Sequence, residues 1–187
     1  LGWEFNGDWY PWAASKDPTA WIAYWKRIVT LMRAVPGTSF RFDWCPVAGQ
    51  TSFRAEDAYP GDDFVDLIGL DVYNASWNPA VKTPDQRWDE QLNSRNGLRW
   101  HRDFAAQHKK PMTFPEWGTG TREDGHGAGD DANFVNQMSG WIDNNVVAYH
   151  NYWDYAKSDY NGKLSTGTQP KSGAAFIARF RSQGVQP

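Results

Sequence analysis

Two glutamates occupy similar settings in the sequence and could act as a catalytic pair. Glu4 follows the apolar "LGW" and Glu116 follows "MTFP", and glycine and aromatic residues come soon after each. We expect both at the carboxyl end of a β-strand. Two carboxyls can cleave a glycosidic bond when one protonates the leaving oxygen and the other, ionised, attacks or stabilises the anomeric carbon. Either glutamate taken alone would more often be an ordinary surface carboxylate.

The aromatic content of the chain is unusual. The chain contains 12 tryptophans, 8 tyrosines and 10 phenylalanines, which together make up 16% of the residues. Rings interleaved with Asn, Asp and Gly favour a surface that contacts a flat, partly apolar ligand such as a sugar, with core packing as the alternative. A partly dry aromatic setting also raises the pKa of a catalytic acid, while hydrogen bonds keep a nucleophile charged. This explains an acid inside "GWEFNGDWYPWA".

Several other side chains are candidates with two open interpretations. Tyr73 could donate its hydroxyl to a catalytic carboxylate or cap a strand, and Trp153 could stack on a sugar or fill the core. Asn6 and Trp9 could contact substrate, although the segment around Trp9 could equally be a rigid loop that packs on itself. For His150 we favour a satisfied core or rim position over a base.

Other chemistries find little support in the sequence. The loop "REDGHGAGDD" matches no metal-ligand spacing and favours a solvated segment, and the Gly-x-Ser-x-Gly elbow of serine hydrolases is absent. Lys+Arg 19 against Asp+Glu 22 leaves no basic face for nucleic acid. No apolar run reaches the roughly 20 residues of a membrane-spanning helix. The single cysteine, Cys45, rules out an internal disulfide.

The chain reads as helices alternating with strands. We expect helices over 17–36, with Asp17 as N-cap and Pro18 first, over 84–107 with an interruption at Asn96-Gly97, over 130–145 and over 172–184. Strands are expected over 39–44, 64–74, 109–116 and 146–155, besides the one ending at Glu4. This order predicts an α/β fold with a parallel sheet in a single domain, residues 1–187. The long loops after the strands would carry the active site of a barrel.

Together these motifs resemble glycoside hydrolase family 26, one of the retaining (β/α)8-barrel glycosidases, which include the β-mannanases. "WEFNGDWYPW" is similar to the family's His-Glu-Met-Asn-Gly followed by Trp-Tyr/Phe-Pro-Trp, and "FDWCP" to its fifth-strand ending. "YPGDDFVDLIGLDVYN" is similar to the stretch that leads into its sixth strand, and "PEWG" to its seventh-strand nucleophile motif. The matches occur in family order and span nearly the whole chain.

The resemblance implies roles for individual residues. Glu4 falls on the general acid/base at the end of the fourth strand and Glu116 on the nucleophile at the end of the seventh. Tyr73 matches a tyrosine that bonds the nucleophile, and Trp153 matches an aromatic platform. No metal or organic cofactor is implied. The other residues expected to contact substrate are Trp3, Asn6, Trp9 and Trp44.

The resemblance also implies an activity. We expect a secreted or cell-surface endo-glycosidase of the retaining kind, with β-1,4-mannan as substrate. Trp3 stands where the mannanases carry histidine. The resemblance therefore implies the class of reaction more directly than it implies the sugar that is recognised. A non-catalytic carbohydrate-binding protein and an inverting enzyme are alternatives. Carboxyls about 5–5.5 Å apart indicate retention, and a separation of roughly 6.5–9.5 Å indicates inversion.

The length of the chain departs from a complete barrel. If Glu4 ends strand four, the chain covers only strands four to eight, whereas a complete barrel has about 250 residues. An open sheet of this size would expose its edges. We therefore expect a preceding segment or a second polypeptide to complete the barrel.

Overall fold

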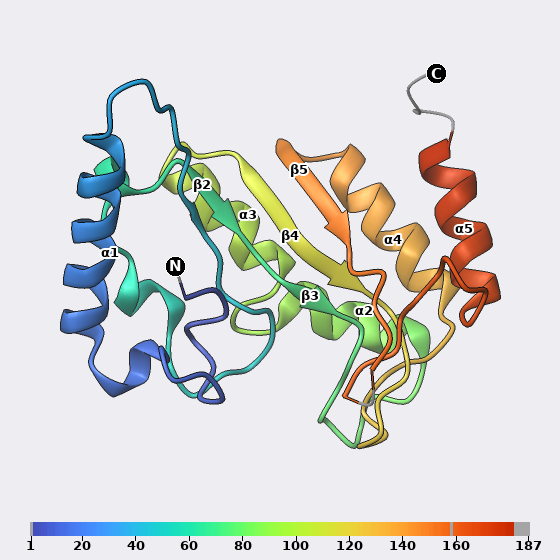
Figure 1. The fold of residues 1–187 in the computed structure, drawn as a ribbon. Helices are drawn as coiled ribbons and strands as arrows, with labels where there is room; N and C mark the ends of the chain where they lie inside the picture. Colours follow the sequence, from blue (N-terminus) through green and yellow to red (C-terminus); the bar gives the residue numbers. More distant parts are fainter. Residues whose placement is uncertain (1, 158, 182–187) are drawn as a thin grey trace. The chain divides into compact units, whose positions relative to one another are not determined.

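The computed structural model describes residues 2–157 and 159–181 of the chain (Figure 1). It is an α/β structure with three short 3-10 turns. In chain order the helices and strands are α1 (Pro18–Arg33), β1 (Asp43–Trp44), β2 (Leu67–Gly69), β3 (Val72–Tyr73), α2 (Pro84–Asn93), α3 (Leu98–Gln107), β4 (Met112–Gly118), α4 (Ala132–Asp143), β5 (Val147–Tyr152) and α5 (Pro170–Phe180). Within the described ranges, no helix combines the length and the apolar character needed to cross a membrane.

Contacts divide the chain into two compact units that alternate along the sequence. The first contains Leu1–Asp71, Asn93–Pro115 and Val147–Tyr149, and the second contains Val72–Leu92, Glu116–Val146 and His150–Pro187. Strands β4 and β5 therefore contribute residues to both units. Each unit carries one of the two glutamates.

The first unit is built on parallel strands. Trp44 of β1 lies opposite Ile68 of β2, and Ile68 lies opposite Met112 at the start of β4. All three side chains are buried, as expected for a parallel sheet covered on its faces. Other members of the same core are Phe5, Trp21, Trp25, Val29, Phe42 and Phe104.

Helix α1 confirms the helix expected from the sequence. The Asp17 side chain accepts a hydrogen bond from the backbone N–H of Ala20 at 2.9 Å, and Pro18 occupies the first position, where its missing N–H costs nothing. The helix ends at Arg33, before Pro36-Gly37. Its buried face, formed by Trp21, Trp25 and Val29, packs into the core of the first unit.

In the second unit, β3 runs parallel to the end of β4, and α4 and α5 pack against one another (Figure 1). The fully buried Trp117 of β4 is surrounded by rings from both helices, among them Phe134 at 6.3 Å and Phe176 at 6.0 Å. Asp131 caps α4 by accepting from two of its first backbone N–H groups. The helix predicted over 130–145 is thus confirmed.

Several strands differ from expectation in extent, among them β1 and β5, which are shorter than predicted. The strand predicted over 64–74 is two strands, β2 and β3. Gly69 pairs with Thr113 and Val72 with Trp117, so three steps along this segment are matched by four along β4. Leu70 and Asp71 lie between the two strands, and Asp71 forms an isolated parallel bridge with Val47. In addition, β4 runs past Glu116 to Gly118, and the expected break in 84–107 is present between α2 and α3.

The strand expected to end at Glu4 is absent from the described residues. Trp3, Glu4, Phe5 and Asn6 lie in turns, and Glu4 has a φ of 50°. The backbone N–H of Glu4 donates to the carbonyl of Cys45 at 2.8 Å. This backbone hydrogen bond anchors Glu4 beside the end of β1, in place of the strand that the sequence predicts.

Gly69 lies where a larger side chain has no room. A Cβ at this position would lie 2.7 Å from Oδ1 of Asp43 and 3.0 Å from the Cβ and Sγ of Cys45. We expect Gly69→Ala to lower the free energy of unfolding by about 1–3 kcal/mol, because the strand or its neighbours must shift. Urea unfolding measures this change.

Gly140→Ala is the matched control for Gly69→Ala. A Cβ on Gly140, in the middle of α4, would meet no atom within 4 Å. Alanine there is expected to raise the free energy of unfolding by about 0.5–1 kcal/mol, because it favours the helix. Equal effects of the two variants would show that the space around Gly69 is not the constraint.

Candidate active site

Glu4 is held in a tight turn with its carboxylate against an indole. Its side chain is largely buried, and Trp9 Nε1 donates to Glu4 Oε2 at 3.2 Å. The Trp9 ring lies directly on the backbone of Gly7, so any Cβ at Gly7 would overlap it. Glycine at this position is therefore what lets the indole reach the carboxylate.

The side-chain amide of Asn6 forms hydrogen bonds with other residues of the protein. Its side chain is buried, Oδ1 accepts from the backbone N–H of Val47 at 2.8 Å, and Nδ2 donates to the Val47 carbonyl at 3.0 Å and to Thr51 Oγ1 at 3.3 Å. Both amide atoms are thus engaged with the loop after β1. The substrate contact predicted for Asn6 finds no support in this placement, which indicates a role in fixing the turn that carries Glu4.

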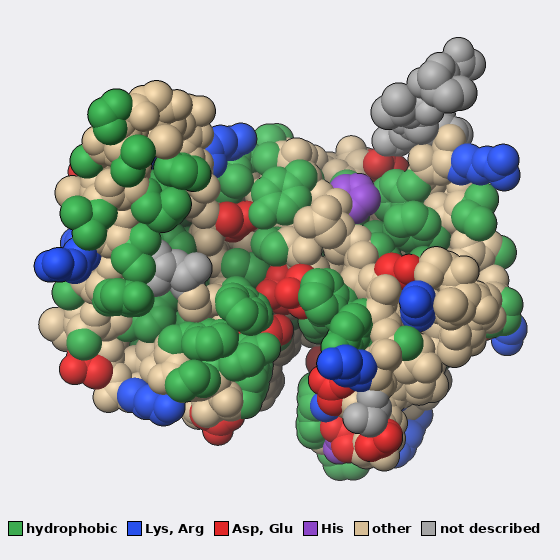
Figure 2. All heavy atoms as spheres, in the orientation of Figure 1, with side chains coloured by type: hydrophobic (Ala, Val, Ile, Leu, Met, Phe, Trp, Pro, Cys, Tyr) green, Lys and Arg blue, Asp and Glu red, His purple; other side chains and the backbone are tan. Residues whose placement is uncertain are grey.

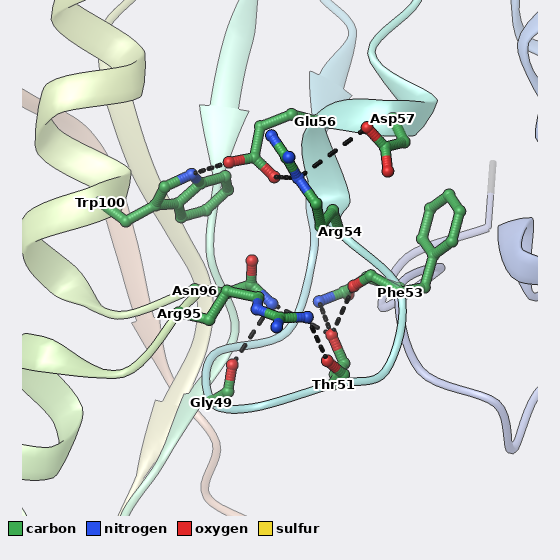
Figure 3. Close-up of polar contacts among 10 residues, drawn as sticks. Gly49, Thr51, Phe53, Arg54, Glu56, Asp57, Arg95, Asn96 and Trp100 are labelled. Carbon is green, nitrogen blue, oxygen red and sulfur yellow. Dashed lines mark hydrogen bonds and ion pairs between the residues drawn. The ribbon is translucent and has the colours of Figure 1, made fainter.

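The loop after β1 is itself fixed by a polar network (Figure 3). Thr51 Oγ1 donates to the carbonyl of Phe53 at 2.8 Å and accepts from Nδ2 of Asn96 at 3.1 Å. Arg95 also donates to the Thr51 carbonyl at 3.2 Å. The segment between α2 and α3, expected only as a helix break, therefore supports the loop that holds Asn6.

The tryptophans of the first unit that were predicted to contact substrate differ in their exposure to solvent. Trp44 is fully buried in the core, and a ring without exposed surface cannot touch a ligand, so its predicted substrate contact is not carried forward. Trp3 and Trp9 are 45% and 53% exposed. Trp3 packs on Trp12 with ring centroids 4.8 Å apart, and Trp12 Nε1 donates to the Trp3 carbonyl at 2.9 Å. The opening segment thus packs on itself and still presents rings to solvent.

Glu116 receives a hydrogen bond from the hydroxyl of Tyr73. Parallel pairing of β3 with β4 brings the two side chains together. Burial raises the pKa of Glu116, and the hydrogen bond from Tyr73 opposes that rise by favouring the charged form. The pair therefore joins a half-buried carboxyl to a donor that favours its charged form, the form in which a nucleophile acts.

Tyr160 supports this pair and was missed by the sequence analysis. Its ring meets that of Tyr73 edge-on, with centroids 4.9 Å apart. Its buried hydroxyl fills the space that a Cβ would need at Gly118 and at Gly162. The glycine after "PEW" was the available signal, although nothing in the sequence names its partner.

The other residues of the last strand have mixed placements. Trp153 is 37% exposed, and its backbone N–H donates to the Trp117 carbonyl at 2.8 Å, beside β4. This leaves part of the indole open, as a stacking platform requires. His150 is half-buried and accepts at Nδ1 from Trp117 Nε1 at 3.2 Å. Burial lowers its pKa, so the expected rim position of His150 is confirmed.

Hydrogen bonds and an ion pair occupy the three aspartates of the "REDGHGAGDD" loop, Asp124, Asp130 and Asp131. Asp124 pairs with Arg122 at 2.8 Å. Asp130 accepts from two backbone N–H groups at the start of α5, at 3.0 and 2.7 Å, and Asp131 caps α4. Among the residues that the structure describes, no cluster of His, Cys, Asp or Glu side chains could hold a metal ion.

The exposed rings are visible on the molecular surface. Figure 2 shows hydrophobic side chains reaching the surface at several places, with acidic side chains between some of them. Trp3 and Trp9, which lie near Glu4 in the sequence, and Trp153, which follows β5, are exposed or partly exposed, whereas Phe5 and Trp117, directly after the two glutamates in the sequence, are buried. Aromatic and carboxylate groups with this exposure can contact a sugar on both its apolar and its polar sides.

Known proteins that this chain resembles are glycoside hydrolases. Residues 1–88 match the model of glycosyl hydrolase family 26. Endoglucanase H of Acetivibrio thermocellus is 36% identical over 96 residues, which cover 44% of this chain and 10% of that protein.

Solved structures extend the likeness to nearly the whole chain. An endo-β-1,4-mannanase from Cellulomonas fimi superimposes with a TM-score of 0.65 at 22% identity, over 93% of this chain and 40% of that one. The catalytic domain of a family 26 endo-β-1,4-mannanase from Bacillus sp. JAMB-750 gives 0.65 at 22% identity, over 96% and 48%. This chain therefore spans less than half of either. The resemblance to the family is confirmed over residues 1–88, which match the model of glycosyl hydrolase family 26, and the chain has the fold of part of a (β/α)8 barrel.

Proposed function

We propose that this chain carries the catalytic residues of a retaining endo-glycosidase that hydrolyses β-1,4-linked mannan. The observation that carries the proposal is the hydrogen bond from Tyr73 to Glu116, because it holds a half-buried carboxyl ready for attack as an anion. Glu116 attacks the anomeric carbon, the glycosyl-enzyme ester forms, and the leaving oxygen departs with a proton.

Glu4 supplies that proton and then removes one from the water that hydrolyses the ester. Its turn, its anchor on Cys45 and its contact with Trp9 Nε1 hold the carboxyl in one orientation. A residue that acts first as acid and then as base must stay in place through both steps. Trp3, Trp9 and Trp153 provide exposed ring surface on which pyranose rings would stack.

The mannan assignment draws on the two mannanases whose fold this chain shares. Endoglucanase H makes a β-glucan the main competitor, because its name refers to glucan cleavage and its aligned region is more similar in sequence. Trp3 bears on this choice, since it directly precedes the proposed acid/base and its ring is accessible. Hydrogen bonds to the sugar would then come from other side chains.

We also propose that activity needs the rest of the barrel, supplied by a preceding segment or by a second polypeptide. The chain covers 40% and 48% of the two mannanase chains. Because polysaccharides do not enter cells intact, the enzyme would act outside the cell or at its surface.

A panel of polysaccharides tests the proposed function. Mannan, xylan, mixed-linkage glucan and cell-wall glycans are incubated with the protein in its completed barrel, and new reducing ends are measured. We expect mannan to give the fastest release, with oligosaccharide products of several lengths. Release of reducing ends from glucan alone would show that the enzyme is a glucanase and that mannan is not its substrate. Binding without release from any polymer would favour a non-catalytic carbohydrate-binding protein.

A further inference from the structure

Trp77 is an exposed tryptophan that the proposed reaction does not use. Its side chain is 62% exposed, more than that of Trp9 or Trp3. It lies in the loop that follows β3 in the second unit. Exposing so large an apolar ring to water is unfavourable. The exposure of Trp77 and the interactions that fix its ring therefore suggest a role for that ring.

Two side chains from another loop hold the Trp77 ring. The His126 ring stacks on it with centroids 5.1 Å apart and planes at 24°, and the Arg122 guanidinium lies 5.2 Å from the ring centroid. Arg122 is in turn fixed by Asp124 at 2.8 Å. The high exposure of Trp77 shows that much of the indole remains open despite these two neighbours.

The backbones of the two loops are also joined. Ser76 N–H donates to the His126 carbonyl at 3.0 Å, and Nδ1 of His126 lies 2.9 Å from the Ser76 carbonyl. Ala75 and Gly127 form an antiparallel bridge next to them. Because both ring and backbone are fixed before any ligand arrives, a ligand that stacks on Trp77 would lose little free energy to ordering.

The position of Trp77 relates it to the reaction. It follows Tyr73 by four residues, so the two Cα atoms lie at most about 14 Å apart. Its neighbours Arg122 and His126 lie in the loop that follows Glu116 along the chain. The same two strands that carry the nucleophile pair thus lead into the loops that carry this ring.

We infer that Trp77 is a sugar-stacking platform that binds a pyranose unit of the polysaccharide away from the bond that is cleaved. A pyranose presents an apolar C–H face to a ring and hydroxyls to its surroundings. Trp77 offers the first partner, and the Arg122 and Asp124 side chains beside it offer donors and acceptors. A chain of several β-linked hexoses is long enough to reach both Trp77 and Glu116. This inference rests on the proposed function for its ligand class.

The test measures oligosaccharide binding in protein that carries Glu116→Ala, so that no turnover interferes. Isothermal titration is run with mannohexaose, cellohexaose and mannobiose. We expect Trp77→Ala to weaken the Kd of the better-bound hexasaccharide about tenfold, because one stacked ring is lost. Mannobiose binding should not change, and Trp77→Phe should retain most of the hexasaccharide affinity. Tyr24→Ala, which removes an exposed ring from α1, should change neither.

The outcomes separate this inference from the proposed function. Unchanged hexasaccharide binding in Trp77→Ala, an equal loss with mannobiose, or no binding of any hexasaccharide to the parent protein would each overturn the platform. With Glu116 intact, the platform predicts a higher KM on polysaccharide and an unchanged kcat. A protein that binds hexasaccharide through Trp77 and hydrolyses nothing would refute the proposed reaction and keep the platform.

Discussion

Glu116→Ala is expected to lower kcat on polysaccharide by about four to six orders of magnitude. The carboxylate forms the covalent bond of the first step, and losing the nucleophile of a covalent mechanism has effects of this size. The fold should survive, because Glu116 is half-buried and is not a member of the hydrophobic core. Release of reducing ends, together with a circular dichroism spectrum to verify folding, measures the change.

Azide distinguishes the loss of a nucleophile from the loss of substrate binding as the cause of the lower kcat. In Glu116→Gly, azide can enter the vacated space and attack the anomeric carbon, so partial recovery of turnover is expected. The control is Glu90→Ala, which removes a glutamate of α2 and should leave kcat unchanged. Full activity in Glu116→Ala would eliminate the proposed mechanism.

Tyr73→Phe is expected to reduce kcat about a hundredfold and to move the acid side of the pH profile upward. The hydroxyl of Tyr73 lowers the pKa of Glu116, against burial, which raises it. Glu116 acts as an anion, so activity falls when the pH drops through its pKa. Without the hydroxyl the pKa rises further, and the fall begins at a higher pH. The expected loss in kcat is similar to the loss seen in other enzymes when a single hydrogen-bond donor to a reacting group is removed.

Tyr149→Phe provides the matched control for this pH shift. Tyr149 also donates to a buried carboxylate, Oδ2 of Asp43 at 2.6 Å, in the first unit. Its loss should reduce stability by about 0.5–1.5 kcal/mol and leave the acid limb in place. If Tyr73→Phe kept the parent pH profile, the pairing of Tyr73 with Glu116 would have no catalytic role.

Local signals predicted the helices, and the family resemblance predicted the Tyr73–Glu116 pair. Asp17 and Pro18 marked the start of α1, and Asn96-Gly97 marked the gap between α2 and α3. Tyr73 was named for a bond to a carboxylate, and the structure contains that bond. Such signals lie within a few residues of each other, or in motifs long enough to be recognised, and this is why they could be read.

What could not be predicted depends on contacts between distant segments. The burial of Trp44 and of the Asn6 amide is decided by partners some 40 residues away or by the assembled core. The division of the segment into β2 and β3 appears only when it is aligned with β4. For Trp77, the residue that holds its ring, His126, lies in a loop that we expected to be merely solvated.

Covalent labelling of Glu116 tests the proposed nucleophile most directly. A 2-deoxy-2-fluoro-glycosyl fluoride slows hydrolysis of the glycosyl-enzyme ester, so the sugar stays on the nucleophile long enough for peptide mass spectrometry. We expect one added sugar, on the peptide containing Glu116, and no labelling in Glu116→Ala. Label on another carboxylate, or turnover of the reagent with inverted product and no label, would contradict the role of Glu116.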